Sequence, residues 1–571
     1  MPLNFGLDAS GNGNNWIVNN ISQVAGSTYD SMLDVPSGNG YADGGNGRGN
    51  YAVLNPLEYY LNSPTNGNLD AYSATNNSNQ VSTFALPNSG KWYWEVTRTE
   101  TDSTSVFSWM VGVVKTDTNK AVTTYSNANA YVYNSWDGSK YTAGSSSAYG
   151  ASWRTNGDVI GCAWDADGQT LTFYKNNVSQ GTAFSSLNYA NGYTMIVSRT
   201  GGATASTLVT NFGQRPFAYT PPTGFKALNT QNLPDATIKK GNQYFNAVTY
   251  AGNSSTQSIT GVGFQPDLVW VKNRSVSGQH VLTDVLRGTD KQLFSSLTNV
   301  EQTSATGLTA FNADGFSLGA NPSPTGSMNS SPDAFVAWNW KGGGTAVTNN
   351  DGNRTASVSA STTAGFSVVT YIFSTSATNT VGHGLGVAPS MIIMKNRTQA
   401  YNWDVYHVSV GYTQRLILNS TSAATSGYWA AAPTSTVFST TTSAALNNDN
   451  MVAYCLAEVA GYSKLGSYTG NGSADGPFVY CGFRPRFVMV KASSAATDWY
   501  IYDTARDTYN VATLELNPNL AAAEQNGTYG SMDINSNGFK LRFATGEVNA
   551  SGATYIYAAF SEVGFKFSNA R

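Results

Sequence analysis

Charged residues are scarce in this chain, and the shortage excludes one class of partner. They make up 11% of its 571 residues, well below the roughly 25% of ordinary soluble domains. The 31 basic and 34 acidic residues almost balance, and no basic stripe is present that would contact phosphates. We therefore expect no nucleic-acid partner, and a polar surface made of hydroxyl and amide groups.

Cysteine and histidine, the residues of many chemical sites, are almost missing. The three cysteines, Cys162, Cys455 and Cys481, are far apart and odd in number, so they predict neither a disulfide framework nor a zinc site. Each is expected to be a small buried apolar residue. The three histidines are His280, His383 and His407. None has a nucleophile elbow or a second metal ligand at helical spacing, so each is interpreted as a surface or packing residue.

Paired carboxylates give little more support for catalysis. Asp165 and Asp167 are two residues apart, but Gln169 stands where a calcium loop needs Asp or Asn, and a hairpin turn explains the pair. We predict no catalytic residue, no cofactor and no metal, and hence a protein that is not an enzyme. A glycan-cleaving enzyme stays open as an alternative, because its two carboxylates come from distant strands. The low acidic content argues against it.

Long apolar runs and heptads are missing too. No stretch is long enough to span a bilayer, so membrane insertion is not expected. Residues 1–8 have no basic region and no apolar core, so no secretion signal is predicted, and we expect synthesis in a cytoplasm. Without heptads, a coiled-coil stalk is not predicted.

Small turn residues and aromatic residues are what the chain does have. It contains 57 Gly, 33 Tyr and 13 Trp, a composition typical of short strands and tight turns. No segment has a sustained 3.6-residue apolar period. The sequence therefore predicts an all-β fold.

Residues 1–49 are turn-rich and are predicted to form an extended arm that docks on a neighbour. The segment from Asp8 to Trp16 is full of Gly and Asn. Its acidic and amide groups could hold calcium, but the spacing matches no strong loop motif, so a solvated turn cluster is the preferred interpretation.

Residues 50–229 show regular strands. The run from Gly157 to Asp165, the turn Asp167–Gly168 and the run from Leu171 to Asn176 predict a β-hairpin. The series GKWYWEV, VGVV, GDVIGCAWD and LTFYKNN, ending in NFGQRPFAY, resembles the SPRY (B30.2-like) domain. That resemblance implies a two-sheet β-sandwich that binds protein or peptide partners through loops at one end. Candidate contacts in these loops are Tyr131, Tyr133, Trp136 and Trp153, with core packing as the alternative for each.

The C-terminal half repeats one pattern three times. Gly263–Pro266, Gly386–Pro389 and Gly482–Pro485 are tight turns, each followed by an apolar run that ends in Lys272, Lys395 or Lys491. Closing aromatic strands follow at 335–340, 451–456 and 555–560. Each unit is about 100 residues long, which is enough for a small core of its own, so we expect β-sandwich-like domains in tandem.

Polar positions after each lysine vary between the copies. Asp284, His407 and Asp503 lie twelve residues past it, and Arg287, Val410 and Arg506 lie fifteen past it. The Asp–Arg pairs suggest either a ligand clamp or a structural ion pair that pins a loop. The structural interpretation is preferred, because no base or nucleophile accompanies them.

The remaining motifs resemble tailed-bacteriophage virion proteins of the tail or fibre type. The matching segments are LDASGNGNNW, YDSMLDVP, TPPTGFKALNT, FQPDLVWVKNR and YIYAAFSEVGFKFSNA. The resemblance implies a structural protein of the phage particle, made in the host cytoplasm. We expect a tail fibre or tail-associated adhesin for host attachment, with a capsid decoration or head fibre protein as the alternative.

The expected partners follow from that resemblance. They are other virion proteins, contacted through the arm, and a receptor on the host surface, a glycan or a protein. Closed symmetry is the default for such a component, and we expect a homo-oligomer, with a trimer as the working assumption. The expected division is an arm at 1–49, a SPRY-like sandwich at 50–229, repeats at 230–342 and 462–571, and between them a linker plus repeat at 343–461. The linker begins at Lys341 and runs to about Ala364 as flexible or irregular chain.

Overall fold

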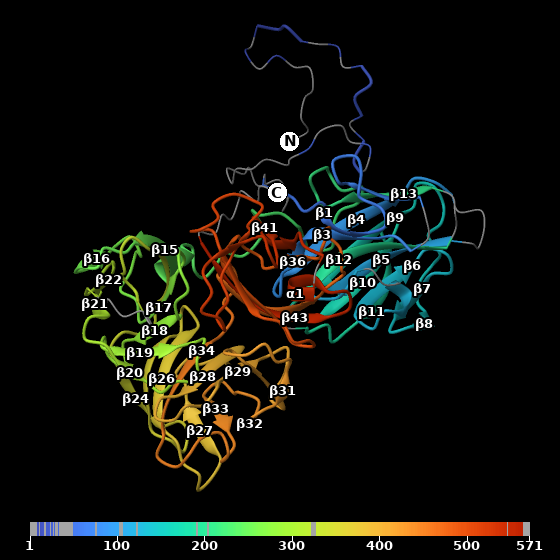
Figure 1. The fold of residues 1–571 in the computed structure, drawn as a ribbon. Coiled ribbons are helices and arrows are strands. Elements are labelled where there is room, and N and C mark those ends of the chain that lie inside the picture. Colours follow the sequence, from blue (N-terminus) through green and yellow to red (C-terminus); the bar gives the residue numbers. More distant parts are fainter. Residues whose placement is uncertain are drawn as a thin grey trace. The chain divides into compact units, whose positions relative to one another are not determined.

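The computed structural model divides the chain into two compact units, one ending at Asp235 and the other beginning at Ala236 (Figure 1). It describes residues 49–562 except 75–76, 102–106, 121–123, 190–191, 202–204, 321–326 and 545. Before residue 49 it describes only positions 8, 10, 12–15, 17, 19–22, 24–26, 28 and 32. The fold is all-β, as the composition predicts, and the one α-helix among the described residues is the four-residue α1 (Gly546–Asn549).

The first unit is a sandwich of two sheets. Their strand orders are β1-β3-β12-β5-β6-β7-β8 and β11-β10-β9-β4-β13-β2, with β14 added in parallel to β4. The elements are β1 (Leu54–Tyr60), β2 (Asp70–Ser73), β3 (Asn79–Leu86), β4 (Lys91–Arg98), β5 (Phe107–Lys115), the 3-10 turn η1 (Thr124–Ser126), β6 (Ala130–Asn134), β7 (Ser139–Thr142), β8 (Ser145–Ala148), β9 (Val159–Asp165), β10 (Thr170–Lys175), β11 (Val178–Phe184), β12 (Tyr193–Gly201), β13 (Ser206–Asn211) and β14 (Lys226–Ala227).

Local sequence explains this sandwich. The predicted hairpin is confirmed, because β9 and β10 pair antiparallel from Thr170 opposite Asp165 onward. Alternating aromatic and aliphatic residues of β4 and β9 face a core that includes Trp94, Trp109, Trp153, Cys162 and Phe173. Burial of such large rings is the main driving force for closing the two sheets.

The second unit contains the three repeats, each built from a larger sheet and a three-stranded sheet, with a further two-stranded sheet in the third repeat. The first repeat has η2 (Gly241–Gln243), β15 (Phe245–Ala251), β16 (Gln257–Ile259), β17 (Leu268–Asn273), β18 (Val281–Asp284), β19 (Lys291–Phe294), β20 (Gln302–Thr303), β21 (Leu308–Asn312), β22 (Gly315–Leu318) and β23 (Ala334–Trp340).

The second repeat follows the same order with two added strands. It has β24 (Val347–Asn349), β25 (Ala356–Ser361), β26 (Phe366–Ile372), β27 (Asn379–Gly382), β28 (Met391–Asn396), β29 (Trp403–His407), β30 (Gln414–Ile417), β31 (Thr425–Ser426), β32 (Trp429–Ala431), β33 (Val437–Thr440) and β34 (Asn450–Leu456).

The third repeat completes the unit. It has β35 (Ser463–Thr469), β36 (Phe478–Tyr480), β37 (Pro485–Ala492), β38 (Trp499–Asp503), β39 (Leu514–Glu515), β40 (Gln525–Asn526), β41 (Met532–Asn535), β42 (Gly538–Leu541), α1 and β43 (Thr554–Ser561). In Figure 1 the first repeat is mainly green, the second yellow to orange and the third orange to red.

The repeats share a core, which a tandem arrangement does not require. Each repeat has its own apolar cluster between its two sheets, seen around Phe316, Phe438 and Phe539. The other face of each large sheet contributes to one common cluster that includes residues of all three repeats, among them Trp338 and Trp403. The repeats therefore form one compact unit rather than three independent ones.

The stretch expected to be a flexible linker is ordered instead. Residues 341–364 contain β24 and β25, and β25 pairs with β26 along its whole length. The carboxylate of Asp267 accepts hydrogen bonds from the amides of Gly342 and Gly344, at 2.8 and 3.0 Å. A buried carboxylate that accepts amide bonds fixes the glycine backbone, which composition alone would leave free.

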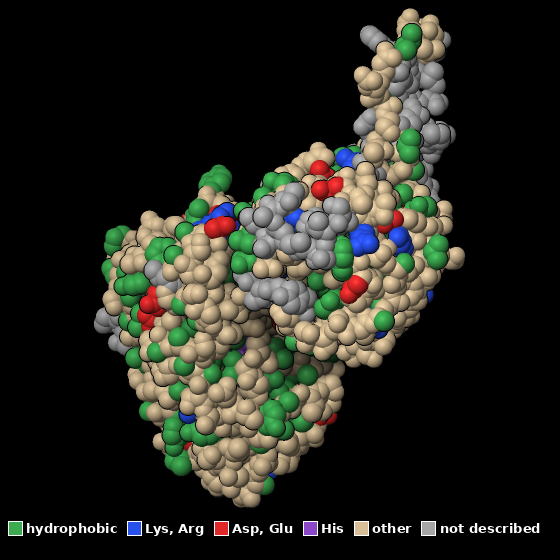
Figure 2. Space-filling model, turned by 90° about the vertical axis from the view of Figure 1, so that its right-hand side faces the viewer, with side chains coloured by type: hydrophobic (Ala, Val, Ile, Leu, Met, Phe, Trp, Pro, Cys, Tyr) green, Lys and Arg blue, Asp and Glu red, His purple; other side chains and the backbone are tan. Residues whose placement is uncertain are grey.

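Surface charge is sparse, as the sequence predicts. On the face shown in Figure 2, Lys, Arg, Asp and Glu occupy a few scattered positions, and most of the described surface is uncharged. Among the described residues, no helix is long and apolar enough to cross a membrane.

Candidate functional site

Two of the four aromatic candidates in the first unit lie in its core. Tyr133 and Trp153 are fully buried, and Tyr133 packs against Phe173 with ring centroids 5.2 Å apart. Tyr131 is half-buried and makes edge contacts with Phe184 and Tyr193. For these three residues the alternative interpretation, core packing, describes what the structure shows.

Trp136 is the candidate that reaches the surface. It lies half-buried in the turn between β6 and β7, and the guanidinium of Arg154 stacks on its ring at 4.3 Å from the centroid. Arg154 is half-buried as well, so both members of the stacked pair are partly exposed to solvent. Such pairs suit planar or anionic groups of a partner. The sequence interpretation missed Arg154, although it directly follows Trp153.

The neighbouring edge of the sheet is built of small polar residues. β8 is the last strand of its sheet, and all four of its residues are exposed. β11 is an edge strand of the other sheet, and the Tyr149 hydroxyl donates a hydrogen bond to its Gly181 carbonyl at 2.5 Å. Together with Trp136 and Arg154, β8 forms the surface that we call the Trp136 face.

A buried carboxylate holds the end of the first unit. Glu95 in β4 accepts hydrogen bonds from the amides of Ala218 and Tyr219 at 2.8 and 3.1 Å, and from the Tyr93 hydroxyl at 3.2 Å. Burial raises the pKa of Glu95 to about 7, although these amides favour the charged form. These hydrogen bonds anchor the end of the NFGQRPFAY segment against β4 of the sandwich. The described part of the arm reaches the same place, where the Gly26 amide donates to Pro216 at 2.8 Å.

The Asp–Arg pairs of the repeats are structural ion pairs. The Nε atoms of Arg287 and Arg506 lie 2.5 and 2.6 Å from the carboxylates of Asp284 and Asp503, and all four side chains are fully buried. Each Asp also accepts two main-chain amides of its own loop. Burial opposes the charge of Arg287, but Asp284, Tyr454 and Glu301 together outweigh it and raise the pKa of the guanidinium.

Asp284, His407 and Asp503 each form a hydrogen bond with another repeat, and the three bonds link the repeats in a cycle. Asp284 accepts a hydrogen bond from the Tyr454 hydroxyl at 2.8 Å, which joins the first repeat to the second. Asp503 accepts one from Trp338 Nε1 at 2.9 Å, which joins the third repeat to the first. His407 Nε2 lies 3.3 Å from the Tyr557 carbonyl, which joins the second repeat to the third. These bonds close a ring of three repeats.

Strand register explains which residue occupies the varying position. Lys272, Lys395 and Lys491 pair with Val336, Val452 and Ile556. Trp338, Tyr454 and Ala558 are therefore equivalent, two residues further along each closing strand. Asp occurs where the facing residue offers a donor. His407 occurs where Ala558 offers none, and it uses the main chain instead.

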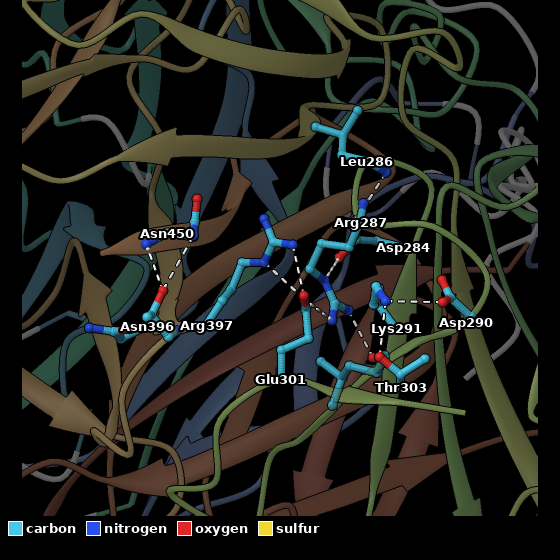
Figure 3. A network of polar contacts seen from close by, with 12 residues as sticks. Asp284, Leu286, Arg287, Asp290, Lys291, Glu301, Thr303, Asn396, Arg397 and Asn450 are labelled. Carbon is cyan, nitrogen blue, oxygen red and sulfur yellow. Dashed lines mark hydrogen bonds and ion pairs between the residues drawn. The ribbon is translucent and has the colours of Figure 1, made fainter. Parts of the chain in front are cut away.

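Charged contacts extend from the Asp–Arg pair of the first repeat into the second (Figure 3). Glu301 accepts hydrogen bonds from Arg397 at 2.8 Å to each oxygen, and from Arg287 at 3.2 Å. A carboxylate between two guanidiniums is held in a bidentate geometry that fixes the two repeats against each other.

The three lysines that end the repeat strands are buried, which sequence reasoning did not foresee. Each donates to the carbonyl of the following residue, at 2.8, 2.6 and 2.7 Å for Lys272, Lys395 and Lys491. Lys272 and Lys491 also reach carbonyls of a neighbouring repeat, Ala521 and Thr421, at 3.2 Å each. Burial lowers the pKa of Lys272 to about 7, and of the other two to about 8.

The remaining chemical residues are structural. All three histidines are buried, and His383 Nε2 bonds the Thr434 carbonyl at 3.1 Å. Asp165 accepts the Gly168 amide at 2.8 Å and Asp167 the Gly90 amide at 2.9 Å, so both hold turns. The three cysteines are buried and free.

No metal centre emerges in the part of the chain that the structure describes, where His, Cys, Asp and Glu do not gather in groups of three or more. In the N-terminal turn, Asp8 accepts the amides of Ser10 and Asn14 at 2.8 and 3.1 Å. These bonds fit the solvated turn cluster that the sequence favours.

Family models match both units. Residues 91–215 match the SPRY domain, and residues 240–563 match a domain of unknown function (DUF7483). The SPRY match confirms the resemblance of the first unit and its β-sandwich fold.

Individual relatives cover small parts of the chain. A 144-residue stretch is 33% identical to the E3 ubiquitin-protein ligase RKP of Arabidopsis thaliana, which is 24% of this chain and 10% of that protein. The chain thus spans about a tenth of the length of this curated relative. Among solved structures, the SPRY domain of human HERC1 is 18% identical with a TM-score of 0.25, covering 28% of this chain and 96% of that one. The TRIM65 PSpry domain is 14% identical with a TM-score of 0.20, covering 28% and 91%.

Proposed function

Because the chain belongs to the family defined by the domain of unknown function (DUF7483), and carries a SPRY domain ahead of it, we propose a non-enzymatic role in which the two units have different tasks. The three-repeat unit is a rigid scaffold, and the SPRY unit supplies the recognition surface. In this proposal the protein is a structural component of a bacteriophage particle, a tail fibre or tail-associated adhesin that binds a glycan or protein of the host surface.

One observation carries the scaffold half of this proposal. The acidic, basic and histidine side chains of the repeats that sequence reasoning marked as candidates have buried structural partners, and three of them bond another repeat: Asp284 with the Tyr454 hydroxyl, Asp503 with Trp338 Nε1 and His407 with the Tyr557 carbonyl. Groups committed to buried structural bonds are not free to act on a substrate. The Trp136 face, by contrast, offers a ring, a cation and exposed hydroxyls, which resembles the residue mixture of antibody loops,.

The particle role rests on the phage-like motifs at both ends of the chain and at the junction after the SPRY unit. It is tested by labelling the particles produced by the genome that encodes the chain. A label on the tail supports the adhesin, and a label on the capsid faces supports the decoration protein instead.

The enzymatic alternative has its own test. The full chain is incubated with host surface polysaccharide, and new reducing ends are measured over time. We expect none above the rate without protein. Sustained release of reducing ends would establish a glycan-cleaving enzyme and overturn the non-enzymatic proposal.

A further inference from the structure

The three contacts between repeats, which we call seams 1–2, 2–3 and 3–1, are built on one main-chain bond. The amides of Glu301, Ala424 and Glu524 donate to the carbonyls of Arg397, Ser493 and Arg274, at 3.0, 2.9 and 2.9 Å. Each acceptor stands two residues past the buried lysine of its repeat. The seams are therefore equivalent in backbone geometry, and differences between them lie in their side chains.

Side-chain charge separates two seams from the third. In seam 3–1, Arg274 binds both oxygens of Glu524 at 2.9 and 2.7 Å, and Arg506 binds the same carboxylate at 2.9 Å. Seam 1–2 repeats this arrangement through Arg397, Glu301 and Arg287. Seam 2–3 has lost every member of it, because Ser493, Ala424 and Val410 occupy the three positions.

Of the two charged seams, seam 3–1 is the one that no chain connection supports. The second and third repeats are joined by a short connection, from Leu456 at the end of β34 to Ser463 at the start of β35. The first and third repeats are the two ends of the unit, so chain connectivity does not hold seam 3–1 together. A closed ring of three needs a non-covalent contact at that position.

Seam 3–1 carries additional polar bonds as well. The Ser295 hydroxyl donates to the Pro518 carbonyl at 2.8 Å, and the Gly278 amide donates to Ala521 at 2.8 Å. Near the ends of the unit, the Asn242 amide donates to Glu562 at 2.7 Å. The bonds run along the whole contact rather than at one point.

We propose that seam 3–1 is an ionic clasp that closes the three-repeat ring within one chain, and that losing it opens the ring there first. An opened ring exposes the contact surfaces of the first and third repeats, which are complementary to each other. The partner they fit is therefore the same pair of surfaces on a second copy of this chain, as in domain swapping.

The experiment removes the clasp in the full chain. In Arg274→Met most of the apolar stem of the side chain is kept and the pair with Glu524 is lost. Hydrogen exchange is then followed at the amides of Gly278 and Glu524 in seam 3–1, and of Ala424 and Thr497 in seam 2–3. We expect exchange at least about tenfold faster in seam 3–1, with seam 2–3 unchanged. Light scattering is expected to show dimers that increase with protein concentration.

Arg397→Met is the matched control, because it removes the equivalent pair from seam 1–2, which the chain itself connects. It is expected to speed hydrogen exchange at the Glu301 amide. The proportions of monomer and oligomer are expected to stay as they are in the wild type. If Arg274→Met does not fold, Arg274→Lys keeps the charge, loses the bidentate geometry, and is expected to give a severalfold change at the same amides. The proposal would be overturned if Arg274→Met raised hydrogen exchange equally at all seams or at none. It would also be overturned if Arg274→Met and Arg397→Met increased the oligomer fraction equally.

Discussion

His407 Nε2 lies 3.3 Å from the Tyr557 carbonyl, at a position where both sister repeats have an aspartate. The Ser409 amide donates to Nδ1 of the same ring at 3.2 Å, so Nε2 carries the proton and donates it to the carbonyl. Burial lowers the pKa of His407 to about 4, which keeps the ring neutral at pH 7. One neutral ring thus replaces an ion pair because the facing residue is Ala558.

We predict that His407→Asp is strongly destabilising, although it restores the residue of the sister repeats. The carboxylate would be buried with Val410 in place of the arginine and Ala558 in place of the side-chain donor. Leaving a buried charge without its partner costs about 3–5 kcal/mol of unfolding free energy. Denaturant unfolding at pH 7 measures the loss. A loss below about 1 kcal/mol would contradict the assignment of this position to a seam.

A second prediction concerns the arginines of the buried pairs. Arg287→Met and Arg506→Met each leave an aspartate buried without its cation, and each is expected to cost about 3–5 kcal/mol. Val410→Met is the matched control at the equivalent position of the second repeat. Because Val410 is apolar and half-buried, that change is expected to cost less than about 1.5 kcal/mol. Equal losses in all three variants would show that packing, and not charge, sets the cost.

The buried lysines predict a pH dependence. The pKa of Lys272 is lowered to about 7 in the folded protein, against about 10.4 in an unfolded chain. Below pH 7 both states are protonated and the burial penalty is present in full. Between pH 7 and 9.5 the unfolded state holds more protons, so the free energy of unfolding rises, by up to about 1.4 kcal/mol per pH unit for one such group.

Lys272→Met separates this effect from other titrations. Its unfolding free energy is expected to rise less steeply than that of the wild type between pH 7 and 9.5. The upper limit avoids the tyrosines, whose unfolded hydroxyls ionise near pH 10. Parallel curves for the two proteins would show that burial does not lower the pKa of the Lys272 ammonium.

The Trp136 face gives a prediction on binding. If the protein has the proposed attachment role, Trp136→Ala is expected to weaken binding of the full chain to host cells about tenfold or more, because aromatic anchors dominate such contacts. Trp136 is half-buried, so stability should fall by little. Val178→Ala, an exposed change on the edge strand β11, serves as the control and should leave attachment unchanged. Attachment that survives Trp136→Ala would place recognition elsewhere.

The sequence predicted the strands and turns well because their signals are local. Asp167–Gly168 marks a hairpin that the structure contains, since such turns need residues that tolerate their backbone angles. The three-fold repeat was also visible, because the turn, apolar run and lysine recur in order. These signals act within a few residues of one another.

The closed ring was not predictable in the same way. Asp284 and Tyr454 are 170 positions apart, and nothing near either residue indicates the other. The buried lysines showed a signal, namely their recurrence at one position, but a terminal lysine on a strand usually lies in solvent. Tyr133 and Trp153 were marked as loop contacts since a single sequence does not show which aromatic rings face the core.

The sharpest test of the proposed virion role is labelling, with an antibody against this chain, of phage particles made by a genome that carries its gene. We expect label on the particle, at the tail, with no label on particles that lack the gene. Particles that remain unlabelled while the protein accumulates in the infected cell would contradict it.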